Sequence, residues 1–138
     1  MTRAYREVDP IVFQERWFKG LDPAIAELVE KRGWTRILTD ALASGNARIR
    51  VPNGSVRDIA NFWMANRPLY EPRLIAAPTL VIVGTQDRDT PPVIGRAVYD
   101  LLTVSDRRFV EVPGGTHFML MEPARGELFA TVREFLSA

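Results

Sequence analysis

The chain has 138 residues, of which 46% are hydrophobic and 25% charged, with a net charge of +1 and no cysteine. That length suffices for one domain with its own core, and the lack of cysteine excludes disulfides, thiolate metal sites and cysteine nucleophiles. Basic and acidic residues interleave, no apolar run reaches the roughly 18 residues of a membrane helix, and the N-terminus lacks the apolar core of a signal peptide. We therefore expect a cytoplasmic protein that binds neither nucleic acid nor membranes.

The first part of the chain, residues 1–70, has the pattern of a small helical region. Asp9-Pro10 and Asp22-Pro23 are typical helix starts, because proline is favoured at the first helical position. A third helix is expected at 35–45 and a fourth at 55–67, the latter after a strong turn signal.

The second part, residues 71–138, alternates strand and helix. Thr79–Val83 is a continuous apolar run, as expected for a strand covered on both faces. A helix opening at Thr90-Pro91-Pro92 follows, and the residues expected on its buried face are Ile94, Ala97, Val98, Leu101 and Leu102. A strand at 109–112 and a final helix from Pro123 come after it. This order predicts an α/β fold, with two parallel strands joined by a helical crossover and the last helix on the opposite face.

Two chemistry-bearing residues follow the two predicted strands. Asp87 comes just after the first strand, and His117, the only histidine, follows the second strand thirty residues later. Functional groups of parallel sheets collect beyond the carboxyl ends of the strands, so we expect the two loops to meet. A carboxylate beside an imidazole fixes its tautomer and stabilises the imidazolium, as in a Ser-His-Asp triad.

The second part also resembles a known family. The stretches Leu80–Pro92, Val112–Phe118 and Glu122–Leu136 look like the C-terminal segment of the α/β-hydrolase superfamily. Residues 69–138 match well, and residues 1–68 are more weakly similar to the helical cap inserted ahead of that segment. The resemblance implies two parts, a cap-like region at 1–70 and a core segment at 71–138.

By this resemblance Asp87 is the triad acid and His117 the triad base. Asp89 is the competing acid, but the family's Gly-x-x-Asp pattern starts at Gly84 and selects Asp87. The simpler interpretation of Asp89, and of Glu122, is an acid near a helix N-terminus.

The nucleophile of the family is not visible in this sequence. A nucleophile elbow reads Gly-x-Ser-x-Gly after a strand, and no serine here fits that pattern. The four serines are Ser44, Ser55, Ser105 and Ser137. The chain therefore looks like the last half of an esterase-like hydrolase, truncated before its nucleophile, and we expect it to be inactive alone.

Aromatic residues are the candidates for substrate binding. Those singled out are Trp17, Phe62, Trp63 and Phe118, which would face a small, apolar, ester-like substrate under a lid. Trp34 and Phe18 share the pattern, and an aromatic stripe at helical spacing is equally consistent with simple core. One histidine and no cysteine offer no ligand cluster, so we expect neither a metal nor a cofactor.

The strand at 79–83 predicts association. In the superfamily it would have a neighbour on its other side, and an open edge leaves backbone groups unpaired. Either a missing N-terminal half pairs there, or two copies pair across a two-fold axis to form a homodimer. The alternative function is accordingly a non-catalytic, hydrolase-derived domain that acts in assembly or binding.

Overall fold

The computed structural model describes residues 3–31 and 48–138, so the third predicted helix at 35–45 and Trp34 lie outside the described residues. The chain forms two compact units. The first unit consists of Met1–Lys19 and Glu30–Glu71, and the second unit consists of Gly20–Val29 and Pro72–Ala138. The described residues combine helices with one antiparallel and one parallel two-stranded sheet, and the fold class is α/β.

The first two predicted helix starts are present. Helix α1 (Pro10–Phe18) begins at Pro10, and Asp9 accepts a hydrogen bond from the Ile11 N–H at 3.0 Å. Helix α2 (Pro23–Lys31) begins after Asp22, which accepts the Ala24 N–H at 2.8 Å. Each aspartate thus satisfies a backbone donor that the first helical turn leaves without a partner.

The first unit contains a small sheet that the sequence pattern did not predict. Strand β1 (Tyr5–Val8) pairs antiparallel with β2 (Ile49–Pro52), so that Arg6 lies opposite Val51 and Glu7 opposite Arg50. Two four-residue strands more than forty residues apart leave little trace in local sequence, because their pairing is entirely non-local.

Asn53 joins this sheet to the helix that follows. Its side chain is buried, donates to the Arg3 carbonyl at 2.9 Å and accepts from the Arg6 guanidinium at 2.9 Å. Helix α4 (Gly54–Asp58) starts directly after it and continues into the π-helix η1 (Ile59–Trp63), which replaces the single regular helix expected at 55–67. Asn53 thus links the N-terminal strand region to the start of α4 through the hydrogen bonds of its buried side chain.

The second unit contains the strand, helix, strand and final helix predicted for it. Strand β3 (Thr79–Gly84) pairs in parallel with β4 (Arg107–Val112), in a register that places Val81 beside Phe109. Helix α5 (Pro92–Leu101) connects them, and helix α6 (Arg125–Leu136) ends the chain. The short 3-10 helices η2 (Pro72–Leu74) and η3 (Met119–Met121) precede β3 and α6.

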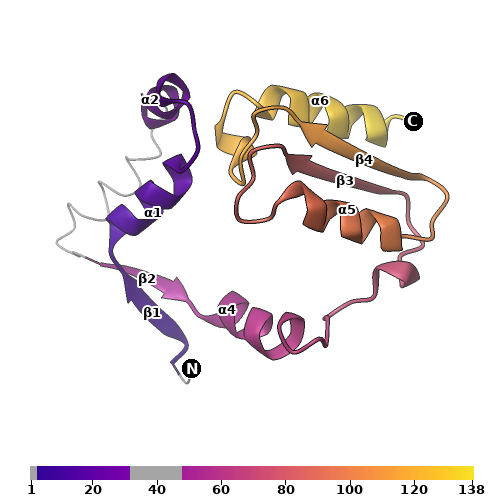
Figure 1. Cartoon of the computed structure of the whole chain (residues 1–138), viewed down its shortest axis with the longest axis horizontal. Coiled ribbons are helices and arrows are strands. Elements are labelled where there is room, and N and C mark those ends of the chain that lie inside the picture. Colours follow the sequence, from indigo (N-terminus) through magenta and orange to yellow (C-terminus); the bar gives the residue numbers. More distant parts are fainter. Residues whose placement is uncertain (1–2, 32–47) are drawn as a thin grey trace. The chain divides into compact units, whose positions relative to one another are not determined.

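The two helices cover opposite faces of the parallel sheet (Figure 1). Gly95 of α5 lies against Val83 and Phe109, which belong to one face. Arg108 points to the other face, where it binds Glu134 of α6 at 2.7 Å and its guanidinium lies 5.9 Å from the centre of the Phe135 ring. Alternation of side chains along a strand separates these two sets of contacts, as expected for a parallel sheet covered on both sides.

The buried face of α5 differs from the predicted one. Ile94 was expected inside but is 50% exposed, whereas Leu102 is buried as expected. The buried residue within the helix is Gly95, which was not among those predicted. A side chain at 95 would collide with the sheet: an added Cβ would stand 2.5 Å from Val83 Cγ1. The helix therefore approaches the sheet through its glycine, and Ile94 turns away from it.

None of the helices in the part of the chain that the structure describes has both the length and the apolar character required to cross a membrane.

The close approach at Gly95 gives a stability prediction. Gly95→Ala should lower the free energy of unfolding by about 1–3 kcal/mol, because the methyl group overpacks the contact with Val83. Gly126→Ala in α6 is the matched control, since an added Cβ there meets nothing within 4 Å. It should leave stability unchanged or raise it by up to about 1 kcal/mol. Urea unfolding followed by circular dichroism measures both, and equal effects of the two substitutions would contradict the packing described.

Candidate active site

The loops that follow β3 and β4 are in direct backbone contact. Gly84 lies so close to Gly115 that an added Cβ would stand 2.1 Å from the Gly115 carbonyl oxygen. The Gln86 N–H donates to that same oxygen at 2.9 Å, and the Gly114 N–H donates to Thr85 Oγ1 at 2.9 Å. Gly114 has a φ of +70°, which side-chain-bearing residues rarely adopt. Glycines thus allow the two loops to meet.

Asp87 is held in place by the backbone that follows it. Its Oδ1 accepts the N–H groups of Asp89 at 2.9 Å and Thr90 at 2.7 Å, and its side chain is only 8% exposed. Oδ2 is left to face His117, whose Nδ1 lies 3.0 Å away. The two carboxylate oxygens therefore have separate partners, and the side chain has one orientation.

The geometry of His117 fixes which ring nitrogen carries the proton. An ionised carboxylate only accepts hydrogen bonds, so Nδ1 is the donor to Asp87 and Nε2 of the neutral ring holds a free lone pair. Among the residues described, none forms a hydrogen bond with Nε2, and the side chain is 40% exposed. Nε2 can therefore accept a proton from any donor that comes within hydrogen-bond reach of it.

Asp89 does not take the place of Asp87. The hydrogen bond to His117 is made by Asp87, while the backbone of Asp89 donates to the Asp87 carboxylate. Asp89 precedes α5, as expected of an acid near a helix N-terminus, but it is neither the cap residue, which is Pro91, nor part of the first turn, which contains no acid.

Glu122 does more than the sequence suggested. It stands just ahead of α6, as expected of an acid near a helix N-terminus, but it is only 2% exposed and its side chain accepts two hydrogen bonds from Thr116. No sequence motif marked it, although a glutamate amid the apolar residues Met119–Met121 and Pro123 is an unusual choice for a solvated position. It lies beneath the loop that carries His117.

The aromatic candidates are divided between the two units. Phe118 lies beside the site, with its ring edge-on to that of His117 at 5.3 Å between centres. Phe62 and Trp63 belong to η1 of the first unit, where Trp63 stacks edge-on against Tyr70 at 5.2 Å. Trp17 is in α1, and its side chain lies outside the described residues. A substrate-binding role for these four residues stays a prediction.

The serines of the second unit lie away from His117. Ser105 precedes β4, so it is at the opposite end of the sheet from the loop that follows this strand. Ser137 follows α6, and its hydroxyl donates to the Arg133 carbonyl at 2.8 Å. Ser55 is in α4 of the first unit, and Ser44 lies outside the described residues. Within residues 72–138, no serine hydroxyl forms a hydrogen bond with Nε2.

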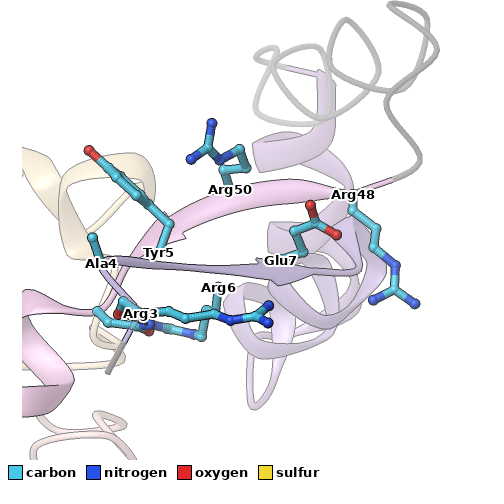
Figure 2. Close-up of a pocket in the computed structure, with 8 residues that line it drawn as sticks. Arg3, Ala4, Tyr5, Arg6, Glu7, Arg48 and Arg50 are labelled. Atoms are coloured by element: carbon cyan, nitrogen blue, oxygen red, sulfur yellow. Dashed lines mark hydrogen bonds between the residues drawn. The ribbon is translucent and has the colours of Figure 1, made fainter. Parts of the chain in front are cut away.

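A concave surface away from the Asp87–His117 pair lies on the small antiparallel sheet. It encloses about 950 Å³ and is lined by eight residues that include Arg3, Arg6, Arg48 and Arg50. Figure 2 shows Tyr5 and Arg50 on one side of the ribbon and Arg3 and Arg6 on the other, so these arginines do not converge on one point. Positive charge spread over both faces defines no particular ligand. Across the described residues, no group of three His, Asp or Glu side chains is placed to hold a metal ion.

Comparison with known proteins gives one partial similarity. No protein-family model matches the chain, and no curated protein matches it. A similar solved structure is that of a serine hydrolase involved in carbazole degradation, the CarC enzyme, with 26% identity and a TM-score of 0.44. The similarity covers 59% of this chain and 32% of that one, so the chain spans about a third of the length of that hydrolase.

Because the two Asp87 oxygens have different hydrogen-bond partners, the effect of Asp87→Asn on His117 can be predicted. Two backbone N–H groups keep an oxygen at the Oδ1 position, so the new NH2 must point at His117 Nδ1. Nδ1 then becomes the acceptor, and the neutral ring changes to the Nε2–H tautomer. The ¹⁵N chemical shifts of the ring, measured by NMR with this single histidine, report the change directly.

Asp89→Asn is the matched control for that experiment. It leaves the Asp87 carboxylate intact, so the ring should keep its Nδ1–H form. The same tautomer in wild type and Asp87→Asn would show that Asp87 does not set the protonation of His117.

Proposed function

We propose that this chain is the acid–base part of an α/β-fold hydrolase of the esterase type. The observation that carries the proposal is the Asp87–His117 pair, with 3.0 Å between Oδ2 and Nδ1 and the imidazole partly open to solvent. The pair follows two neighbouring parallel strands, at the end of the sheet where such folds place their active sites. The nucleophile is supplied by a polypeptide segment outside these 138 residues.

In the proposed reaction His117 moves a proton twice. As the nucleophilic serine of the other segment attacks the ester carbonyl, Nε2 takes its proton, and Asp87 stabilises the imidazolium through Nδ1–H. Nε2 then gives the proton to the departing alkoxide, and an acyl-enzyme remains. Water then attacks the acyl-enzyme and loses a proton to Nε2, which passes a proton to the departing serine oxygen as the carboxylic acid is released.

The substrate we propose is small and apolar. Phe118 supports this choice, because its ring packs against the imidazole and makes the immediate surroundings of the base apolar. In the same proposal Trp17, Phe62 and Trp63 belong to a cap region over the substrate, as expected from the resemblance of residues 1–68 to such caps.

A second candidate function, assembly without catalysis, is favoured by the outer edge of β3. Within the described residues β3 pairs only with β4. The N–H groups of Thr79 and Thr85 donate to backbone carbonyls at the two ends of β4. Because backbone N–H groups point alternately to the two sides of a strand, those of Leu80 and Ile82 point away from β4, to the unpaired edge of β3. Val93, in the first turn of α5, is 72% exposed and is apolar surface that a partner could cover. A nucleophile-bearing segment or a second copy of the chain would pair here.

Complementation tests the hydrolase. Co-expression with a segment encoded upstream of this chain, carrying Gly-x-Ser-x-Gly after a strand, should give a complex that hydrolyses short p-nitrophenyl esters. His117→Ala should lower kcat by on the order of a thousandfold or more, because the nucleophile loses its base. The chain alone should show no activity above that of the His117→Ala variant.

Three outcomes would contradict parts of this proposal. An isolated chain that hydrolyses the ester in a His117-dependent way would show that no outside nucleophile is needed. A pure, stoichiometric complex that lacks activity, or the absence of any such segment, would favour the assembly role instead.

The open edge makes its own prediction. The amides of Leu80 and Ile82 should exchange hydrogen rapidly in dilute, monomeric chain and become protected when β3 pairs with another strand. Sedimentation and amide exchange, run over the same concentration range, should change together. A monodisperse monomer in which both amides are already protected would contradict association through this edge.

A further inference from the structure

The carboxylate of Glu122 is buried and both of its oxygens are used. Its side chain is 2% exposed, Oε2 accepts the Thr116 N–H at 3.0 Å, and Oε1 accepts the Thr116 hydroxyl. Burying a charge is costly unless hydrogen bonds compensate for the lost water. Both compensating donors belong to the residue directly before His117.

The Thr116 hydroxyl extends this anchoring past His117. Its oxygen accepts the Phe118 N–H at 3.2 Å while its hydrogen is donated to Glu122. The residues on both sides of His117 are thus tied to one carboxylate, Thr116 directly and Phe118 through the Thr116 hydroxyl. Such a chain of charge-assisted hydrogen bonds leaves the backbone at 116–118 little freedom.

Glu122 is itself held by the elements around it. Its N–H donates to the Met119 carbonyl at 3.2 Å, and its carbonyl accepts the Arg125 N–H at 3.1 Å where α6 begins. Helix α6 is bound to β4 through the Arg108–Glu134 ion pair. A continuous set of contacts therefore leads from the sheet to the His117 loop.

We propose that Glu122 is a positioning residue for His117. It fixes the backbone on both sides of the histidine, so that Nδ1 stays at Asp87 and Nε2 stays open to a reacting group. The relevance to catalysis rests on the function proposed above, but the effect on the imidazole does not. Glutamine is a poorer substitute, because its oxygen can accept the Thr116 N–H but its NH2 forces the Thr116 hydroxyl to change from donor to acceptor, and the negative charge that strengthens both hydrogen bonds is lost.

The test uses the full, ¹⁵N-labelled chain with Glu122→Gln. We expect the histidine ring signals to move from the Nδ1–H pattern to an average of both tautomers. Amide exchange at 116–118 should become about tenfold faster or more, because hydrogen bonds to a charged group are replaced by weaker neutral ones. Exchange in β3 and β4 should not change. Glu127→Gln, an exposed position in the first turn of α6, is the matched control and should change neither signal.

A second pair of variants decides the matter even where Glu122→Gln folds poorly. Thr116→Val removes the hydroxyl, so the histidine ring signals should average over both tautomers and the Phe118 amide should exchange faster. Thr116→Ser keeps the hydroxyl and should behave as wild type. Unchanged ring signals in Thr116→Val, or exchange that accelerates equally throughout β3 and β4, would overturn the proposal. A complex with the upstream segment that lacks esterase activity would contradict the proposed hydrolase function. It would not affect the NMR test of Glu122, because the histidine ring signals are measured on this chain alone.

Discussion

The site depends on a contact between two backbones, that of Gly84 at the end of β3 and that of Gly115 after β4. An added Cβ at Gly84 would lie 2.1 Å from a carbonyl oxygen, a distance that no relaxation of flexible side chains can relieve. The same carbonyl accepts the Gln86 N–H, so the two loops are packed together at the glycines and are also joined by a hydrogen bond. A carboxylate and an imidazole that are thirty residues apart in sequence can meet only because these loops touch.

From this contact outwards, each half of the acid–base pair has its own support. Asp87 is fixed by the backbone of its own loop, which accounts for one carboxylate oxygen and frees the other. His117 is fixed from the opposite side, through Thr116 and the buried Glu122. The helices on the two faces hold the strands from which both loops emerge. The orientation of the Asp87–His117 pair at the surface therefore depends on the buried hydrogen bonds between Thr116 and Glu122.

Local sequence was informative where chemistry and structure are both local. The apolar run of β3, the Asp-Pro helix starts and the Asp and His that follow parallel strands all have signals within a few residues, and the structure contains each element. The order strand, helix, strand also sufficed to predict the parallel pairing, because that connection admits few alternatives.

What the sequence could not reveal is non-local or depends on burial. Strand β1 is four residues long and needs a partner far along the chain. Glu122 looks like any acid ahead of a helix until the fold encloses it. The buried face of α5 was misplaced because Gly95, with no side chain to count as hydrophobic, makes the closest contact with the sheet.

The parallel register of β3 and β4 has a further meaning for how the site forms. A slip of one residue along β4 would displace the His117 loop by about 3.3 Å and turn its strand's side chains to the other face. The hydrogen bond to Asp87 could not survive such a shift, so the acid and base meet in one alignment of the strands alone. Their contact therefore reports correct pairing of the sheet, because the imidazole has its protonation pattern only when β3 and β4 are in this register.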